Sequence, residues 1–442
     1  MSGDTRARLK RWLETGEARL QPLTFSQREL WEASPVPVAD VSNHIGTFME
    51  VRSKISPKEC EAAMQRVVDR QEVLRLSILP GKSQPLLLIR STSAPVMEFY
   101  ELSAAESAPE ALEERMRGFF EKPFDLLRGP LYRVEILRRG PDDLVLVFAI
   151  HHAIADGWTL GVFVQDIFAS YLFGAMGALG GLPPVPLSYT DWGAAERAAW
   201  PAEKLADHAR FWKTQLAGAP RLWNPPAADA PRRVEREVTF VPADVTTAVR
   251  DLARRSDATL FSALLTAFQI TLYRWTGKTD IVVGTPVANR AKQAVRETMG
   301  YCSGNVPIRG RVVPGRAFEE SVRETHRSAV DSFANAMPFA ELVRALNDPP
   351  APGHNPIFDV RFALQNHPIP DIDVPGLSVH LSMRSTGTAR FDLGCEITET
   401  GSRLEVVWLH RPALFSAAEI ACLQGLFLEV LTGAGRPAAL KV

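Results

Sequence analysis

Cysteine is scarce in this chain of 442 residues. The four cysteines, Cys60, Cys302, Cys395 and Cys422, lie far apart and form no CxxC pair. Structural zinc sites and disulfide frameworks need cysteines, alone or with histidines, at characteristic spacings. The sequence therefore predicts neither a metal site nor a disulfide scaffold, and it favours reduced thiols in a cytoplasmic protein.

Long apolar runs are also absent. The longest, LVLVFAI at 144–150, is far shorter than the roughly 20 residues that a membrane-spanning helix needs. The N-terminus lacks the hydrophobic region of a secretory signal. Its basic stretch RARLKRW is followed by Glu14 and Glu17, which favours an amphipathic helix over a polybasic arm. We therefore expect no membrane partner.

The chain has no excess of charge of either sign. Lysine and arginine number 50 and aspartate and glutamate 51, which gives a net charge of −1. Proteins that bind nucleic acid usually carry a basic surface, and nothing in these totals indicates one. Hydrophobic residues at 46% and charged residues at 23% are typical of a soluble globular protein.

The length exceeds what one core ordinarily covers, so we expect two lobes. The clearest linker is the Gly- and Pro-rich stretch GALGGLPPVPLSY at 177–189. It predicts an N-terminal lobe at 1–180 and a C-terminal lobe at 181–442. Two further stretches are irregular: 224–233 is expected to connect elements inside the second lobe, and 347–356 to precede a strand. We expect a monomer.

Helix and strand signals alternate along the chain. Ser56, Pro57 and Glu59 form a helix start with a capping box, and Gly277 is typical of a helix end. Apolar patterning predicts strands at 144–150, 280–286, 355–366 and 404–410, and helices at 158–173, 259–277 and 416–431. The fold class predicted is α/β (α+β) with mixed sheets.

The most informative segment is HHAIADG at 151–157, which follows the apolar strand and precedes a helix. Neighbouring side chains at a strand end point to opposite faces, so one histidine would be buried while the other faces a cavity. Histidine titrates near neutral pH and suits general-base catalysis. Asp156 would supply a fixed charge or a structural ion pair. Gly157 would permit a backbone conformation or a close approach that a Cβ would block.

A structural interpretation competes with this one. A His-His pair by itself is more often structural or part of a weak metal site, and two ligands without a third do not make a zinc site. The complete HHxxxDG pattern between strand and helix is what favours a catalytic site.

HHAIADGW resembles the signature of the condensation domains of nonribosomal peptide synthetases, whose wider superfamily includes chloramphenicol acetyltransferase. Further segments match the family's motifs in the expected order. They are LTFSQRELW at 23–31, DRQEVLR at 69–75, SYTDWGAAER at 188–197, GTPVANR at 284–290, GYCSGNVPIRG at 300–310, MPFAELV at 337–343 and HNPIFDVRFALQN at 354–366. Gln71 stands where the second of these motifs usually has histidine. The resemblance covers essentially the whole chain.

The resemblance implies two chloramphenicol-acetyltransferase-like lobes in a V shape, with an active-site tunnel at their interface. His152 matches the catalytic histidine and His151 a mainly structural one. Asp156 matches an aspartate that organises the site through a salt bridge, with Arg290 the expected partner and Arg75 the competing one.

Other residues receive implied roles. Gly157 is a candidate oxyanion donor through its backbone N–H. Asn355 matches an asparagine near the tunnel, and Ser303 belongs to a second-lobe motif assigned to the tunnel. Trp31 and Trp158 are expected to pack rather than react.

The implied chemistry is acyl transfer without a metal or redox cofactor. The phosphopantetheine arm of an acyl or peptidyl carrier protein would present the donor thioester, and a hydroxyl or amine acceptor would attack it. Because the chain holds no adenylation, carrier or thioesterase domain, we expect a small soluble acceptor. An ester product is slightly favoured over an amide, in assembly or chain release of a natural product such as a polyketide or peptide.

Alternatives within and beyond the family stay open. An epimerisation domain shares HHxxxDG but also carries an EGHGRE-like segment, which is not found here. A heterocyclisation domain has aspartates in place of the histidines, and a non-catalytic recruitment domain usually loses the motif. Outside these, a CoA-dependent acyltransferase is the main rival, and dependence on a carrier protein separates the two.

Overall fold

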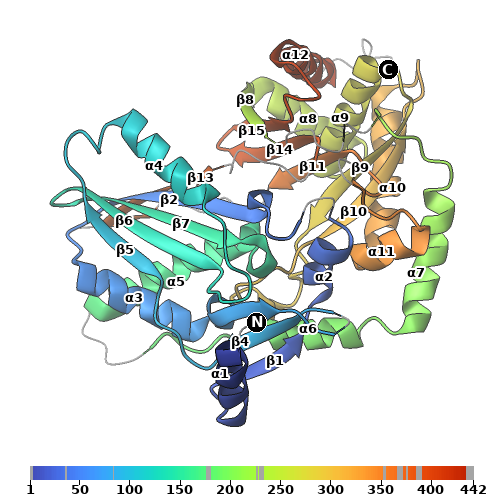
Figure 1. The fold of residues 1–442 in the computed structure, drawn as a ribbon. Helices are drawn as coiled ribbons and strands as arrows, with labels where there is room; N and C mark the ends of the chain where they lie inside the picture. Colours follow the sequence, from blue (N-terminus) through green and yellow to red (C-terminus); the bar gives the residue numbers. More distant parts are fainter. Residues whose placement is uncertain are drawn as a thin grey trace.

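The computed structural model describes residues 3–34, 37–82, 84–175, 181–224, 227, 233–351, 355–365, 372–374, 377–384 and 391–434 (Figure 1). Parts of the three expected linkers lie outside the described residues, and so do His354 and Asn366 of the last motif. No helix in these ranges is long and apolar enough to cross a membrane.

The strands form two six-stranded sheets and one three-stranded sheet. They are β1 (Ala18–Pro22), β2 (His44–Arg52), β3 (Leu76–Leu79), β4 (Leu86–Arg90), β5 (Met97–Glu101), β6 (Tyr132–Gly140), β7 (Asp143–His151), β8 (Glu235–Val241), β9 (Asp280–Val287), β10 (Gly304–Arg311), β11 (Val360–Gln365), β12 (Ile372–Val374), β13 (Leu377–Arg384), β14 (Leu393–Thr400) and β15 (Arg403–His410).

The helices alternate with these strands along most of the chain. They are α1 (Gly3–Glu14), α2 (Phe25–Glu32), α3 (Pro57–Arg70), α4 (Pro109–Glu121), α5 (Gly157–Ala175), α6 (Tyr189–Ala198), α7 (Ala202–Gln215), α8 (Ala243–Arg255), α9 (Leu260–Thr276), α10 (Phe318–Ala334), α11 (Phe339–Leu346) and α12 (Ala417–Ala434), with 3₁₀ turns η1 (Val41–Asn43), η2 (Glu72–Arg75), η3 (His152–Ile154) and η4 (Gln293–Val295).

The start of α3 and the end of α9 lie where the sequence predicts them. Ser56 caps α3 through a reciprocal capping box with Glu59, and Gly277 ends α9 in the left-handed conformation at φ +73°. One expectation is wrong in extent. The strand predicted at 355–366 begins only at Val360, because the preceding residues form a bend in which Ile357 has φ +71°.

The first six-stranded sheet carries the strand that leads into HHAIADG. Its order is β12-β13-β2-β7-β6-β5, and helices cover both faces (Figure 1). On one face, Phe148 of β7 stacks on Phe163 of α5 with ring centroids 3.9 Å apart. On the other, Gly46 of β2 lies directly under the ring of Phe120 from α4. Burial on both faces explains why this strand is an unbroken apolar run.

The second six-stranded sheet has the order β10-β9-β11-β14-β15-β8. β11 runs parallel to both of its neighbours, whereas the remaining pairs are antiparallel. Phe268 of α9 stacks on Phe362 of β11, and Phe427 of α12 meets Trp408 of β15 edge to face. The α/β class with mixed sheets is therefore confirmed.

The lobe boundary at 180/181 stays a prediction. Strand pairing connects the two parts of the chain across it. β13, from the later part, pairs antiparallel with β2 over Ser378–Arg384, and β12 pairs with β13. The later segment thus supplies two strands to the first sheet. Helix α2 makes a second connection, because Arg28 donates hydrogen bonds to Glu32 and to Glu341 of α11, each at 2.8 Å.

Candidate active site

The two adjacent histidines occupy different environments at the end of β7. His151 is fully buried: its Nε2–H donates to the carbonyl of Val38 at 2.8 Å, and its Nδ1 accepts from the backbone N–H of Ala153 at 3.0 Å. Burial lowers the pKa of His151 to about 3. This ring is therefore neutral and uses both nitrogens to hold the strand end in place.

His152 opens η3 and is only partly buried. Its ring lies against Tyr301, with ring centroids 4.5 Å apart and planes at 69°. Its Nδ1 atom is buried, so Nε2 is the nitrogen we assign to face a substrate. The separation into one buried and one accessible histidine agrees with the sequence expectation.

Asp156 is the most heavily bonded side chain of the junction. Its Oδ1 and Oδ2 lie 3.2 and 3.3 Å from Nη2 of Arg290, and both side chains are almost completely buried. Oδ1 also accepts from Thr159, while Oδ2 accepts from the backbone N–H groups of Cys302 at 3.0 Å and Ser303 at 3.1 Å. The expected ion pair is confirmed, and it fastens the HHAIADG turn to residues 300–303.

Arg290 is held by carbonyl groups from the same segment. It donates to Val295 and Thr298 through Nη1 and to Gly300 through Nη2, at 2.6–2.9 Å. The preceding Asn289 adopts φ +54° and donates its Nδ2–H to the carbonyl of Cys302 at 2.9 Å. The segment therefore folds around the guanidinium and delivers it to Asp156.

The alternative pairing of Asp156 with Arg75 is wrong. Its guanidinium donates to the backbone carbonyls of Val68, Asp69 and Arg90 instead of reaching Asp156. The C-terminal end of α3 leaves carbonyls without helical partners, and an arginine in the next turn satisfies them.

Gln71 links α3 to the segment that holds Arg290. Its Nε2 donates to Asp166 at 2.7 Å and to the carbonyl of Glu297 at 2.9 Å, and its Oε1 accepts from the N–H of Met299 at 2.9 Å. A neutral amide can donate and accept at once. The glutamine that replaces the motif's histidine therefore joins the end of α3 to Asp166 of α5 and to the backbone of Glu297 and Met299.

Three other predicted residues surround the junction. Ser303 contributes its backbone N–H to Asp156, and Trp158 donates its indole N–H to the carbonyl of Arg296 at 2.9 Å, which supports packing rather than reaction. Gly157 is exposed and begins α5. A Cβ at Gly157 would meet no protein atom within 4 Å and no left-handed φ is recorded there, so the predicted backbone need for glycine is not supported.

Asn355 lies beside residues of α2 and β10. It lines, with Glu29 and Asn305, a cavity of about 10 Å³ whose lining does not include either histidine. Its backbone carbonyl accepts a hydrogen bond from Arg221. Asn355 therefore lies beside Glu29, the carboxylate that accepts a hydrogen bond from the hydroxyl of Tyr301.

Helix α2 supplies functional neighbours that sequence reasoning missed. Gln27 donates its Nε2–H to the carbonyl of Ala153 at 2.8 Å, and Ser26 donates to the carbonyl of Cys302 at 3.1 Å. Glu29 accepts a hydrogen bond from the hydroxyl of Tyr301 at 3.2 Å. The available signal was LTFSQRELW, in which polar residues share a short helix with apolar anchors, but their partners are distant in sequence.

Gly300 explains how the Tyr301 segment approaches so closely. It has φ +153°, and a Cβ there would lie 2.2 Å from the ring of Tyr189. The Tyr189 hydroxyl donates to the carbonyl of Tyr301 at 3.0 Å. Glycine is therefore required for this contact, which helps set Tyr301 beside His152.

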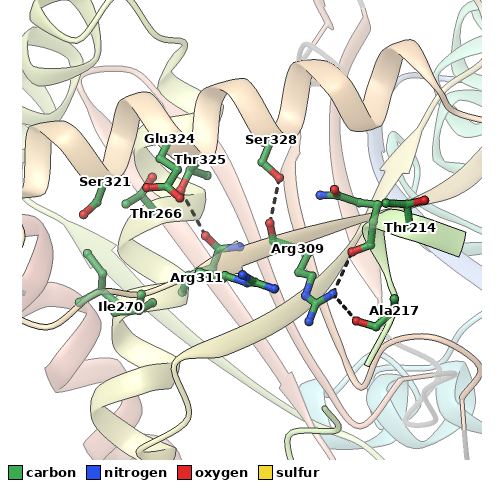
Figure 2. A pocket seen from close by; sticks show the side chains of 13 residues that line it. Thr214, Ala217, Thr266, Ile270, Arg309, Arg311, Ser321, Glu324, Thr325 and Ser328 are labelled. Carbon is green, nitrogen blue, oxygen red and sulfur yellow. Dashed lines mark hydrogen bonds between the residues drawn. The ribbon is translucent and has the colours of Figure 1, made fainter. Parts of the chain in front are cut away.

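A cavity of about 500 Å³ lies elsewhere, between α9, β10 and α10 (Figure 2). Arg309 in its wall pairs with Asp280 and donates to the carbonyls of Gln215 and Ala217. None of its lining residues comes from HHAIADG, so this cavity is separate from the candidate site at His152. Among the described residues, no group of three or more His, Cys, Asp or Glu could hold a metal ion.

Comparison with known proteins agrees with this geometry. The family model "Condensation domain" matches residues 17–439. Phosphinothricin tripeptide synthetase PhsC of Streptomyces viridochromogenes is 30% identical over 90% of this chain and 38% of its own length. Malpinin synthetase of Mortierella alpina is 27% identical over 90% of this chain and 5% of its own length. The chain thus spans well under half of either relative.

Solved structures show the same fold. The X-domain from teicoplanin biosynthesis has a TM-score of 0.84 at 21% identity and covers 94% of this chain and 95% of its own. The first condensation domain of the calcium-dependent antibiotic synthetase has a TM-score of 0.78 at 20% identity. The match covers 95% of this chain and 97% of that chain.

Removing one partner of the buried Asp156–Arg290 pair should destabilise the protein by roughly 3–5 kcal/mol, because the other charge is left buried. Asp156→Ala and Arg290→Ala would be compared by urea unfolding. The control is Arg210→Ala, which removes an exposed pair with Asp207 and should change stability by less than about 1 kcal/mol. Equal losses in all three variants would contradict a structural role for the buried pair.

His151 should make stability fall on acidification. Its pKa is about 3 when folded, against the ordinary 6.5, so below pH 6.5 the unfolded chain binds a proton that the native protein does not. Wild type should lose up to about 1.4 kcal/mol per pH unit more than His151→Gln as the pH drops from 6.5 toward 5. Urea unfolding at several pH values measures both slopes, and parallel curves would rule out the neutral buried ring. His151→Ala should lose soluble protein or stability at every pH.

Proposed function

This chain belongs to the condensation-domain family, and on that premise we propose that it transfers an acyl group from a carrier-protein thioester to an amine or hydroxyl acceptor. The product is an amide or an ester in the assembly or release of a natural product.

The main support for the proposal is that the three ionisable side chains of HHAIADG lie in different environments. His151 is held neutral by burial and has both ring nitrogens bonded. Asp156 is saturated by Arg290, Thr159 and two backbone N–H groups. His152 is the partly exposed histidine of this turn, and a histidine side chain suits proton transfer near neutral pH.

The proposed reaction places the donor thioester on a phosphopantetheine arm beside His152. The acceptor's N–H or O–H gives its proton to Nε2 of His152 as the nucleophile attacks the carbonyl. As the C–S bond breaks, the departing thiolate takes that proton from His152, which restores the neutral imidazole. Holding both reactants in line supplies much of the acceleration, and a general base adds roughly 10²–10⁴-fold.

Gly157 is the proposed donor to the developing oxyanion. It is the first residue of α5, where backbone N–H groups lack helical partners and the helix dipole favours negative charge. The open space beside its Cα leaves room for a ligand that a side chain would fill.

An ester product is slightly favoured over an amide because a general base accelerates a hydroxyl nucleophile more than an amine nucleophile. A hydroxyl must lose its proton around the moment of attack, whereas a neutral amine is already nucleophilic and needs a weaker base or none.

His152→Ala should lower hydroxyl transfer by roughly 10²–10⁴-fold and amine transfer by much less, with only a slight change in melting temperature. Mass spectrometry of products would follow amine and hydroxyl versions of one acceptor with an acyl-loaded carrier protein. Near-normal turnover by the folded variant refutes the general-base assignment. Acceptance only of an amine bound to a second carrier protein refutes the ester assignment.

Carrier dependence separates this proposal from a CoA-dependent acyltransferase. At equal low concentration, the acyl-carrier protein should give clearly faster transfer than the same acyl group on CoA, because only the carrier adds protein–protein contacts. With a net charge of −1, attraction to an acidic carrier must come from a local basic patch. Comparable rates with both donors would contradict carrier delivery.

A further inference from the structure

The cavity between α9, β10 and α10 has no part in the mechanism proposed above. It measures about 500 Å³, which lies within the range of roughly 300–1,000 Å³ that is typical of small-molecule sites. Figure 2 shows side chains of α10 pointing toward Arg309 and Arg311 of β10. Most of the lining residues are polar, so a ligand that fits this cavity must be polar as well.

Gln269 of α9 brings a hydrogen-bond donor to the wall of this cavity. The residue is 2% exposed, and its Oε1 accepts from the hydroxyl of Thr325 at 3.3 Å, but its Nε2 has no acceptor among the described residues. The amide packs against β10, where a Cβ at Gly310 would lie 2.3 Å from Nε2 and 2.4 Å from Oε1. A buried N–H without an acceptor is costly, so this donor indicates an oxygen atom of a ligand as its partner.

The charged side chains of the lining, taken with their partners, leave one positive charge in excess. Arg309 pairs with Asp280, and Glu324 pairs with Arg316. Arg311 is exposed, and within the part of the chain that the structure describes no carboxylate pairs with it. A guanidinium binds carboxylate and phosphate groups through parallel hydrogen bonds, so the cavity favours an anionic group beside Arg311.

Hydroxyl groups of the lining are arranged to accept hydrogen bonds from a ligand. Thr266 donates its own proton to the carbonyl of Ser262 at 2.7 Å. Ser328 likewise donates to the carbonyl of Arg309 at 2.8 Å. A hydroxyl whose proton is used in this way offers only its lone pairs. The ligand therefore needs donors of its own, and the excess positive charge favours neutral hydroxyl groups over an ammonium.

We propose that this cavity binds a small hydroxylated anion, a polyhydroxy carboxylate or a polyol phosphate. The anionic group lies at Arg311, and an oxygen of the ligand accepts from Nε2 of Gln269. The lining contains no residue of HHAIADG, so this site is separate from the proposed acyl transfer and does not depend on it.

Calorimetric titration of the full chain with four six-carbon probes tests the ligand class. At least one of gluconate and sorbitol phosphate should show saturable binding at a single site, and the tighter of the two identifies the anionic group as carboxylate or phosphate. Sorbitol carries the hydroxyl groups without the charge, and hexanoate carries the charge without the hydroxyl groups. Each should bind at least roughly tenfold more weakly, because it lacks one half of the contacts.

Two variants locate the bound probe. Arg311→Gln should weaken binding roughly tenfold or more, because it removes a charged donor, and Gln269→Met should weaken it roughly threefold or more, because it removes a neutral one. The matched control is Arg327→Gln, since Arg327 is an exposed arginine of α10 outside the lining. Arg327→Gln makes the same change of charge as Arg311→Gln and should leave the affinity unchanged. His152→Ala should also bind the probe as the wild type does, which separates this site from the proposed reaction.

Each contrary outcome identifies a different failure. Absence of saturable binding by both gluconate and sorbitol phosphate overturns the proposal. Equal weakening by Arg311→Gln and Arg327→Gln overturns it as well, because the probe would then respond only to net charge. Unchanged affinity in folded Gln269→Met would mean that a water molecule alone meets the amide, and the site as proposed would be wrong. Urea unfolding without a probe checks that the variants fold, and if Gln269→Met does not, the exposed Arg311 carries the test.

Discussion

The buried contact between Asp156 and Arg290 joins two parts of the chain 134 residues apart. Taking two charges out of water is costly unless they pair well and their remaining hydrogen-bonding positions are filled. Both conditions are met here, because the Asp156 oxygens also accept from Thr159, Cys302 and Ser303. The turn after β7 and the segment before β10 therefore have one favourable relative position, and the site depends on it.

Adjacent histidines acquire opposite properties because the backbone changes conformation between them. His151 still belongs to β7 and points into the core, where burial keeps it neutral and its two nitrogens are used by the backbone. His152 begins η3 and leaves the strand geometry, so its ring meets Tyr301 instead. The buried, neutral His151 and the buried Asp156–Arg290 ion pair thus hold one accessible histidine ring at the end of a largely buried strand.

Helix α2 is the element that couples this junction to the later half of the chain. Gln27 bonds the backbone of η3, Ser26 bonds the carbonyl of Cys302, and Arg28 reaches Glu341 on α11. These contacts require polar side chains to be buried in a helix of eight residues. The cost is offset because each of them has a partner in a region where water is excluded.

The sequence by itself determined the local elements and indicated the candidate site. Ser56 and Glu59 predict the start of α3, Gly277 the end of α9, and HHAIADG the turn that we propose as catalytic, because caps, left-handed glycines and strand ends depend on neighbouring residues. The resemblance to condensation domains supplied Asp156 and Arg290 as partners. Only the tertiary structure decided that β13 joins β2, that Arg75 bonds the end of α3, and that Glu29 meets Tyr301, 272 residues away. Such contacts depend on how whole sheets and helices pack, and no local pattern encodes that arrangement.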